Sequence, residues 1–461
     1  MSIKSISPID GSVFAERAPA TAAQIDATLA RAHAAQQLWR QVPLPERAAI
    51  IERFCQEFER RGADIASGLT LQIGRPIRFA PSEVRGTLER ARYMAAAAPA
   101  ALADIDPEAK AGFRRFIRRE PLGVVFTVAA WNYPYLIAVN SVVPALMAGN
   151  AVILKHSAQT PLCAEAFAAC LEAAGLPGGV FQVLHLRHED TARVIGDPRV
   201  DFVAFTGSVA GGHAVQRAAA ARFIGLGLEL GGCDPVYVRH DADLAHAIEN
   251  IVDGAYFNSG QSCCGLQRIY VHESIYDRFT RGCIELIQQY RLGDPRDPET
   301  TLGPLVRTAA ADAVRAQVRA AEAAGARPAI DERAFTLSKA GTPYLAPQLL
   351  LDAPADSAVM REEIFGPVAG VMKVRSDAEA VAHMNDSNFG LTAAVWTCDA
   401  QAAEALGAQV HTGTWFMNRC DYLDPALAWV GVKDSGRGCT LSVVGYEHLT
   451  RPKSFHLRVT T

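Results

Sequence analysis

The sequence predicts an α/β protein with two domains, each built around a mostly parallel β-sheet that helices cover on both faces. The chain has 461 residues, which is more than a single hydrophobic core usually serves. Short, continuous apolar runs alternate with helical stretches, as expected for strands buried on both faces. A hydrophobic fraction of 49% with 20% charged residues is typical of a globular protein.

The amino-terminal segment is predicted to be helical. Thr21-Ala22-Ala23-Gln24 has the pattern of a capping box and opens one helix, and Pro45-Glu46-Arg47 opens a second, which we expect to end at Gly62. From Gly123 onward, short apolar runs alternate with helical stretches. The boundary between the two sheet domains is expected near Leu230. Strands are predicted at 124–128, 151–154, 180–184, 200–205, 236–238, 269–271 and 368–371, with a helix over 163–174.

The charge pattern argues against several classes of partner. A formal net charge of -4 leaves no basic surface for nucleic acid or for an anionic membrane. The most apolar region, 135–154, is interrupted by polar residues, proline and glycine, so no membrane span is expected. One basic cluster is interpreted as the solvated edge of a strand, and it consists of Arg114, Arg115, Arg118 and Arg119.

The cysteines and the amino terminus indicate the cellular setting. Ten cysteines are present without C-x-x-C spacing, so we expect neither a metal site nor a disulfide framework. The amino terminus has no apolar signal core. We therefore expect a reducing, cytoplasmic setting.

Two segments have the features of a site for a phosphorylated cofactor. Phe205-Thr206-Gly207-Ser208 follows a predicted strand and precedes a helix, where backbone N–H groups and the helix dipole bind a pyrophosphate. An ordinary strand-to-helix turn would carry glycines too. Lys155 follows the strand at 151–154, where doubly wound sheets bind their ligands, although a surface lysine would also fit.

Three polar residues could together perform chemistry on a carbonyl group. Cys263, at the end of Phe257-Asn258-Ser259-Gly260-Gln261-Ser262-Cys263, is a candidate nucleophile once its thiol is ionised. Burial would raise the pKa of Glu229 and suit it to act as a general base. Asn132 could stabilise an alkoxide, an effect of about 3 to 4 kcal/mol in comparable sites. Taken singly, each residue has a structural alternative, such as a core cysteine or a turn-forming asparagine.

Together these motifs resemble the aldehyde dehydrogenase superfamily. The most specific part is Gly260-Gln261-Ser262-Cys263 combined with Glu229-Leu230-Gly231-Gly232. Trp131-Asn132-Tyr133-Pro134 and Glu362-Glu363-Ile364-Phe365-Gly366-Pro367 also match, and the resemblance extends from Ser7 to Gly438. Some features are similar to a short bacterial branch that includes succinate-semialdehyde dehydrogenases.

The resemblance implies the domain organisation. A NAD(P)-binding domain with a Rossmann-like sheet would cover 1–102 and 122–230, and a second Rossmann-like domain, the catalytic one, would cover 231–440. A small β arm for oligomerisation would comprise 103–121 and 441–461. This arm would give the arginine cluster an interface role and would make the protein a homodimer or homotetramer.

The resemblance also implies roles for individual residues. Cys263 would be the nucleophile, Glu229 the base for a hydrolytic water, and Asn132, with the Cys263 backbone N–H, the oxyanion hole. The cofactor would be NAD or NADP: Lys155 would contact the adenosine ribose, Ser208 the pyrophosphate, and Glu363 with Phe365 the nicotinamide ribose and ring. The other positions expected at the cofactor are Trp131, Gly207 and Gly231, and those expected to line the aldehyde pocket are Tyr133, Ile137, Phe257, Ser262, Cys264 and Trp429.

Several positions depart from the commonest family pattern. Where many members that prefer NAD have a glutamate three residues after the lysine, this chain has Ala158, which removes a repulsion against a 2′-phosphate and fits NADP. The proline after the lysine is replaced by His156, and the Gly-Gly-Lys of many members by Gly231-Gly232-Cys233. The segment Asn418-Arg419-Cys420-Asp421-Tyr422-Leu423-Asp424-Pro425 is also unusual for the family, and it leaves the substrate open.

The predicted function is oxidation of an aldehyde to a carboxylic acid through a thiohemiacetal and a thioester on Cys263, with water rather than coenzyme A as the acceptor. Mostly aromatic and apolar pocket positions favour a small apolar or aromatic aldehyde. A succinate-semialdehyde-type substrate is the alternative if Arg419 turns inward, although we expect that arginine to face solvent. A cofactor-free cysteine hydrolase is the alternative from another class, but no histidine motif points at Cys263.

Overall fold

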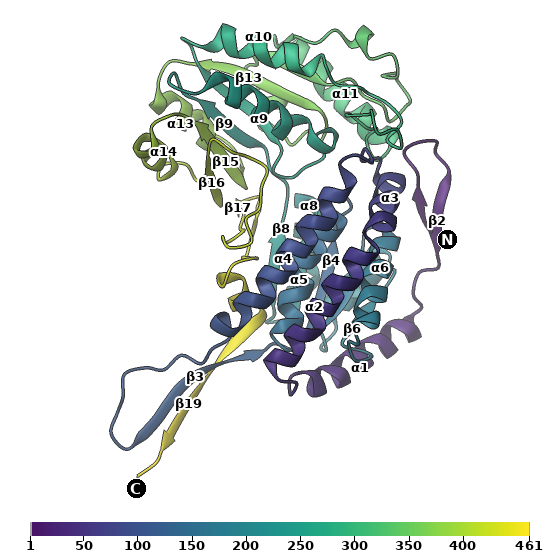
Figure 1. The fold of residues 1–461 in the computed structure, drawn as a ribbon, viewed down its shortest axis with the longest axis vertical. Helices are drawn as coiled ribbons and strands as arrows, with labels where there is room; N and C mark the ends of the chain where they lie inside the picture. The colour runs from purple at the N-terminus through teal and green to yellow at the C-terminus, as the bar shows by residue number, and fades with distance from the viewer. Residues whose placement is uncertain (1, 461) are drawn as a thin grey trace.

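The computed structural model describes residues 2–460. The chain forms two α/β units, one above the other in Figure 1, and a two-stranded ribbon that projects from the lower unit. A six-stranded sheet forms the centre of the lower unit and a seven-stranded sheet that of the upper unit. The predicted fold class, α/β with two parallel-sheet units and a small β arm, is confirmed.

The lower sheet has the strand order β18-β8-β7-β4-β5-β6. All neighbours are parallel except β18, which is antiparallel to β8. Four of the runs predicted as strands lie on β4, β5, β6 and β7. The bounds are Val124–Ala129 (β4), Ala151–His156 (β5), Phe181–Val183 (β6), Phe202–Thr206 (β7), Gly225–Glu229 (β8) and Gly436–Arg437 (β18).

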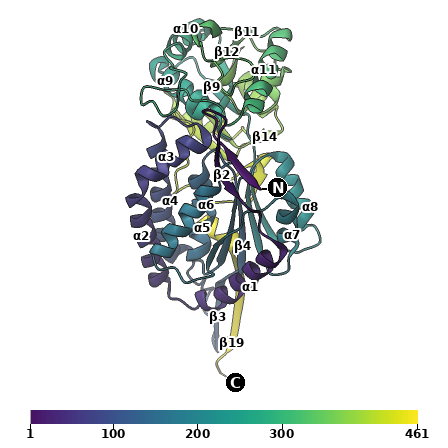
Figure 2. The same cartoon turned by 90° about the vertical axis from the view of Figure 1, so that its right-hand side faces the viewer.

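Alternate residues of β4 face opposite layers of helices. Val125 lies in one core with helices α2 to α6, whereas Val124 and Phe126 lie in another with α1, α7 and α8, on the other side of the sheet in Figure 2. Covering both faces explains why the strand is a continuous apolar run. The helices are Ala22–Trp39 (α1), Leu44–Arg60 (α2), Gly62–Ile73 (α3), Ala80–Ala101 (α4), Pro134–Met147 (α5), Pro161–Ala173 (α6), His188–Gly196 (α7) and Val209–Ala219 (α8).

The upper sheet has the strand order β11-β12-β13-β10-β9-β15-β16, and only β11 runs antiparallel to its neighbour. Its strands are Asp234–Val238 (β9), Leu266–His272 (β10), Arg327–Pro328 (β11), Gln348–Leu351 (β12), Val368–Val374 (β13), Thr392–Trp396 (β15) and Thr414–Met417 (β16). Helices Leu244–Tyr256 (α9) and Tyr276–Ile287 (α10) cover one face, and the other carries Thr308–Ala323 (α11), Ala358–Arg361 (α12), Asp377–Asn385 (α13) and Ala400–Gly407 (α14). Minor elements are the strands Phe389–Gly390 (β14) and Val432–Lys433 (β17) and the 3₁₀ turns Phe257–Gly260 (η1), Glu332–Ala334 (η2) and Val444–Leu449 (η3).

The amino-terminal predictions hold in part. The capping box is present: the Gln24 N–H donates to Thr21 Oγ1 at 3.3 Å, and Gln24 Oε1 accepts from the Thr21 N–H at 2.8 Å. The second helix, α2, ends at Arg60, two residues before the predicted Gly62. The sequence did not predict that Gly62 begins a further helix, α3, where it faces Val84 of α4. A hairpin of Ile3–Ile6 (β1) and Val13–Arg17 (β2), which the sequence did not predict, precedes the helices.

The projecting ribbon pairs Phe113–Pro121 (β3) with Thr450–Arg458 (β19) in antiparallel register. The rings of Phe116 and Phe455 stack at 4.5 Å, and the Arg118 guanidinium lies 5.0 Å from the Phe116 ring centre. The arginine cluster therefore does lie on a strand of a narrow, solvated ribbon. Upstream of β19, Tyr446 is buried against the lower unit, and its hydroxyl donates to the Met94 carbonyl at 2.6 Å.

Candidate active site

One edge of the lower sheet gathers residues predicted to bind the cofactor and two of those predicted to be catalytic. Trp131 and Asn132 follow β4, Lys155 lies near the end of β5, Ser208 follows β7, and Glu229 ends β8. These four strands are parallel neighbours, so their carboxyl ends lie at the same edge.

The loop that carries Cys263 joins η1 to β10 and has an unusual backbone. Asn258, Ser259 and Gly260 all have positive φ, and a side chain on Gly260 would overlap the Gly366 carbonyl. The Gln261 side chain fixes the turn, because its Oε1 accepts from the Val306 N–H at 2.8 Å. Left-handed backbone of this kind persists only where its surroundings determine it, and it occurs often at active sites.

The Glu229 and Cys263 segments come together because β9 and β10 are parallel neighbours. Gly232 lies against the carbonyl of Cys263, where a Cβ atom would overlap that oxygen. The close approach requires glycine at this position. The two motifs that the sequence associates are therefore in direct contact.

Asn132 is held by a buried network that the sequence did not reveal. Its Nδ2 donates to the Gln261 carbonyl at 3.2 Å, and its own carbonyl accepts from Arg75 Nη2 at 2.6 Å. Arg75 is fully buried, forms an ion pair with Glu83 and donates through Nε to Asn258 Oδ1 at 3.1 Å. Arg75 thus connects the Asn132 segment to the loop of Cys263.

Glu229 has two hydroxyl partners, and neither was predicted. Thr440 Oγ1 donates to its Oε1 at 2.6 Å, and Thr206 Oγ1 donates to its Oε2 at 3.3 Å. Burial raises the pKa of Glu229 above the ordinary glutamate value, while Thr440 and the Arg90 charge oppose that rise. Thr206 adjoins the predicted Gly207 turn, but no local signal marks Thr440, which is distant in sequence.

Two cavities meet at Cys263, and they share Asn132, Thr206 and Cys263 in their walls. The first, here named the Ser208 cleft, has a volume of about 630 Å³ and includes six predicted cofactor positions, Trp131, Gly207, Ser208, Gly231, Glu363 and Phe365. The second, the Tyr133 cavity, has a volume of about 410 Å³ and includes Glu229 and all six predicted pocket positions, Tyr133, Ile137, Phe257, Ser262, Cys264 and Trp429.

In the Ser208 cleft, Ser208 caps helix α8, and its Oγ accepts from the Gly211 N–H at 3.2 Å. Glu363 accepts from the Gly232 N–H at 3.1 Å, and burial raises its pKa to about 7. The rings of Trp131 and Phe365 meet edge to face at 5.7 Å.

Lys155, the seventh predicted position, does not line the Ser208 cleft. It is buried, and among residues 2–460 it has no hydrogen bond or ion pair, so burial alone lowers its pKa. The neighbouring His156 has a structural place: its Nδ1 meets Thr160 Oγ1 and its Nε2 meets the Pro134 carbonyl, both at 3.1 Å. Burial lowers the His156 pKa to about 3, so the ring is neutral.

The Tyr133 cavity also has charged residues that the sequence did not place there. Besides Glu229, five charged residues line it, and they are Arg85, Glu89, Arg90, Asp253 and Asp421. They come from α4, α9 and the loop after β16, where spacing gives no sign that they face one cavity. Arg419 does not line this cavity; it is exposed, and its guanidinium lies 3.6 Å from the Tyr422 ring centre.

A family model described as the aldehyde dehydrogenase family matches residues 1–455. The chain belongs to the aldehyde dehydrogenase family. A succinate-semialdehyde dehydrogenase [NADP(+)] of Mycobacterium avium (strain 104) is 35% identical over 98% of this chain and 96% of its own length. Among solved structures, a succinic semialdehyde dehydrogenase from Streptococcus pyogenes in complex with NADP+ has a TM-score of 0.94 and 29% identity, with 99% of each chain covered. A lactaldehyde dehydrogenase has a TM-score of 0.95 and 30% identity over 99% of this chain and 96% of that one.

The predicted family and enzyme class, aldehyde dehydrogenase, are therefore confirmed. Two observations on the described residues accompany this result. No histidine lines the Ser208 cleft or the Tyr133 cavity as formed by residues 2–460, so a cysteine–histidine pair of the hydrolase kind is not present there. None of the helices described has both the length and the apolar character needed to cross a membrane.

Proposed function

We propose that this aldehyde dehydrogenase oxidises an aldehyde to the free carboxylic acid with NAD or NADP, using Cys263 as nucleophile. The observation that carries the proposal is the position of Cys263 at the junction of two cavities. One cavity has glycines and a helix amino terminus suited to a dinucleotide, and the other contains Glu229.

The first step proposed is addition of the Cys263 thiolate to the carbonyl carbon. A C–S bond forms and the carbonyl oxygen becomes an alkoxide. Only one of the two N–H bonds of the Asn132 amide is needed for the Gln261 carbonyl, so the other can donate to the alkoxide, together with the Cys263 backbone N–H. Arg75 holds the Asn132 backbone and therefore positions the oxyanion hole.

The second role is that of Glu229 in releasing the acid. After oxidation the acyl group is a thioester on Cys263, and Glu229 would take a proton from the water that attacks it. The C–S bond then breaks and the thiolate returns. A buried carboxylate with a raised pKa is a stronger base than an exposed one, and the two threonine hydroxyls hold it in place.

The residues present fit a dinucleotide. The Lys155 ammonium is buried and has no partner among residues 2–460, and a ribose hydroxyl would satisfy it. Ser208 uses its Oγ lone pair for the Gly211 N–H and keeps its hydroxyl proton to donate to a phosphate oxygen. Glu363 and Phe365 would contact the ribose and ring at the other end. When bound, the nicotinamide ring would supply the hydride acceptor.

NADP is the cofactor that we propose as preferred. Ala158 is exposed and uncharged where a carboxylate would repel a 2′-phosphate. The M. avium relative and the S. pyogenes structure are described as NADP proteins. Comparing kcat/KM for NADP and NAD tests this preference, and a higher value for NAD would contradict it.

For the substrate, we propose an aldehyde with an apolar or aromatic stem. Tyr133, Ile137, Phe257 and Trp429 line the cavity, and Arg419, the cation considered for a carboxylate tail, is exposed. Succinate semialdehyde remains a second candidate, because relatives that match nearly the whole chain act on it by name. Measuring kcat/KM for benzaldehyde and succinate semialdehyde by absorbance at 340 nm decides between them. A strong preference for the second would overturn the choice.

Two further outcomes test the reaction class. Acyl-CoA formed in the presence of coenzyme A would contradict hydrolysis through Glu229. Ester hydrolysis without NAD(P), and no formation of NAD(P)H with any aldehyde, would favour a cysteine hydrolase.

The domain organisation and setting are part of the same proposal. We assign NAD(P) binding to 1–102 and 122–230, catalysis to 231–440, and assembly into a cytoplasmic homodimer or homotetramer to the arm in 103–121 and 441–461. The open edges of the two-stranded ribbon of β3 and β19 support a role in assembly. Sedimentation of the intact protein tests the oligomeric state.

A further inference from the structure

We propose that the Asp421 carboxylate selects a short aldehyde that carries an ammonium group. The inference rests on the proposed function and narrows its substrate: an apolar stem between the aldehyde and a positive charge. Asp421 belongs to the loop after β16, far in sequence from every motif of the family resemblance that surrounds Cys263.

Asp421 lies in the wall of the Tyr133 cavity, close to the nucleophile. Its Oδ1 accepts from the Cys264 thiol at 2.9 Å and from Ser262 Oγ at 3.1 Å, so it is bonded to both chain neighbours of Cys263. Its Oδ2 has no hydrogen bond among residues 2–460. One oxygen therefore fixes the side chain, and the other is free to receive a ligand group.

Among residues 2–460, no ion-pair partner neutralises the charge on Asp421. Burial raises its pKa to about 6, so the side chain is mainly a carboxylate at neutral pH. The positive charge of Arg75 lowers the pKa of Asp421, but Arg75 already forms an ion pair with Glu83. A partly buried, uncompensated carboxylate is unfavourable, and a cationic ligand would offset that cost.

The other charged groups of the cavity favour a cation as well. Asp253 and Glu89 add two carboxylates, and Glu89 accepts from the Tyr422 hydroxyl at 2.9 Å. Arg90 is buried, and its Nη1 donates to the Leu136 carbonyl at 3.2 Å and to Asn140 Oδ1 at 3.1 Å. Arg85, the remaining cation, is exposed, as are Glu89 and Asp253. With Asp421 and Glu229, the wall has four carboxylates and two arginines. A carboxylate tail would therefore meet more negative than positive charge.

Two aromatic side chains of the cavity add to the attraction. The Tyr133 hydroxyl is buried without a hydrogen-bond partner among the described residues, so its lone pairs can accept from an ammonium group. Aromatic faces attract cations, and Phe257 also lines this cavity.

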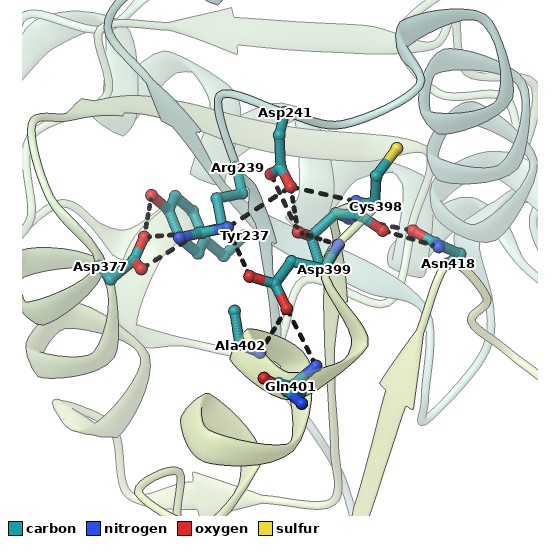
Figure 3. Close-up of polar contacts among 10 residues, drawn as sticks. Tyr237, Arg239, Asp241, Asp377, Cys398, Asp399, Gln401, Ala402 and Asn418 are labelled. Atoms are coloured by element: carbon teal, nitrogen blue, oxygen red, sulfur yellow. Dashed lines mark hydrogen bonds and ion pairs between the residues drawn. The ribbon is translucent and has the colours of Figure 1, made fainter.

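The loop that presents Asp421 is held firmly at its base. Figure 3 shows Asn418 bonded to the backbone beside Cys398, next to the ion pairs of Arg239. Asn418 Oδ1 accepts from the Thr397 N–H at 3.0 Å, and its Nδ2 donates to the Thr397 carbonyl at 2.9 Å. Asn418 and Asp421 both have positive φ, so the surrounding contacts determine this conformation.

The position of Asp421 also limits the length of the substrate. Asp421 is bonded to the side chains on either side of Cys263, and consecutive Cα atoms lie about 3.8 Å apart. We therefore infer that an ammonium group bound at Oδ2 lies near the carbonyl carbon under attack. We expect two or three carbons between the aldehyde and the nitrogen.

The test compares 3-aminopropanal with butanal, which has the same shape without the charge, and with succinate semialdehyde. For the wild type, we expect kcat/KM for 3-aminopropanal to exceed that for butanal by at least about tenfold. Asp421→Asn should lower this ratio by about tenfold, and Asp421→Glu should restore most of it. Asp424→Asn is the matched control: that exposed aspartate is in the same loop, accepts from the Ala426 N–H at 2.9 Å and does not line the cavity.

Butanal oxidised as well as or better than 3-aminopropanal by the wild type would overturn the inference, whether or not the variants fold. An unchanged ratio in a folded Asp421→Asn variant would do the same. Either result leaves the proposed function standing, because butanal is still oxidised. No NAD(P)H from any aldehyde would instead contradict the proposed function.

Discussion

The Ser208 cleft and the Tyr133 cavity share Cys263, but their walls differ in kind. Much of the cleft is backbone: the ends of β7 and β8, the cap of α8, and glycines where a side chain would collide. Side chains from α4, α5, α9 and the loop after β16 form the cavity, and five of them are charged.

This difference separates what is general from what is specific. Backbone donors and glycine turns recognise phosphate and ribose, which are the same for every substrate of the enzyme. Side chains that project from separate elements can be exchanged without rebuilding the fold, so they set the choice of aldehyde. Substitutions in the Ser208 cleft should therefore change the kinetics of the cofactor only, and those in the Tyr133 cavity the kinetics of the aldehyde only. Substitutions at Cys263 should affect both.

The largest effect is expected at the junction itself. Cys263→Ala removes the nucleophile and should lower kcat by at least about 10⁴-fold. Both cavities remain, so quenching of protein fluorescence should show NADP binding with a nearly unchanged Kd. Loss of NADP binding in a folded variant would mean that the two sides are not separable.

Next in size is the effect of Glu229→Gln, which removes the proposed base but keeps the side-chain volume. We expect a burst of reduced cofactor equal to the enzyme concentration and a steady-state rate lower by roughly 10² to 10⁴. Stopped-flow absorbance at 340 nm measures both phases. Full steady-state turnover would refute the assigned role.

The Glu229→Gln variant also tests the pH dependence of the steady-state rate. Burial raises the pKa of Glu229, and only its deprotonated form can accept a proton from water. The steady-state rate of the wild type should therefore fall as the pH drops through that raised pKa and level off above it. In Glu229→Gln this acid limb should vanish. An unchanged limb would assign it to another group.

The fold could largely be predicted because buried parallel strands have a clear local pattern. The runs at 124–128 and 151–154 fall on β4 and β5, which are covered on both faces. The hairpin β1–β2, the strands β8, β12, β15 and β16 and the two-residue β18 were missed. Their pairing is set by partners elsewhere in the chain, and short strands have no period long enough to detect.

The residues of the site fall into two groups, those that the sequence revealed and those that it did not. Ser208, Glu229 and Cys263 belong to short motifs, so sequence reasoning brought them together. The segment 418–425 was recognised as unusual, but no role could be predicted for Asp421 within it or for Arg75. Each is a single charged residue whose importance comes from a contact distant in sequence: Cys264 is 157 residues from Asp421, and Asn258 is 183 residues from Arg75. The charge of the Tyr133 cavity was therefore missed, although all six of its predicted positions do line it.

A smaller effect, confined to the cofactor side, is expected for Lys155→Met. Losing a hydrogen bond to a charged group should raise KM for NADP by about 10 to 100-fold and leave KM for the aldehyde nearly unchanged. Because the Lys155 ammonium is buried without a partner in the described part of the chain, the variant should not lower the melting temperature. A fall in melting temperature with unchanged KM for NADP would give Lys155 a purely structural role.

The smallest effect is expected for Ala158→Glu, which adds a charge at an exposed position after β5. Repulsion of about 1 kcal/mol between this carboxylate and a 2′-phosphate should raise KM for NADP roughly fivefold, with little change for NAD. Ala158→Gln is the uncharged control and should leave the NADP to NAD ratio as it is. Because salt screens exposed charges, the effect of glutamate should shrink as ionic strength rises. An equal change for both cofactors would show that position 158 does not face the 2′-phosphate, and the proposed preference would lose its structural basis.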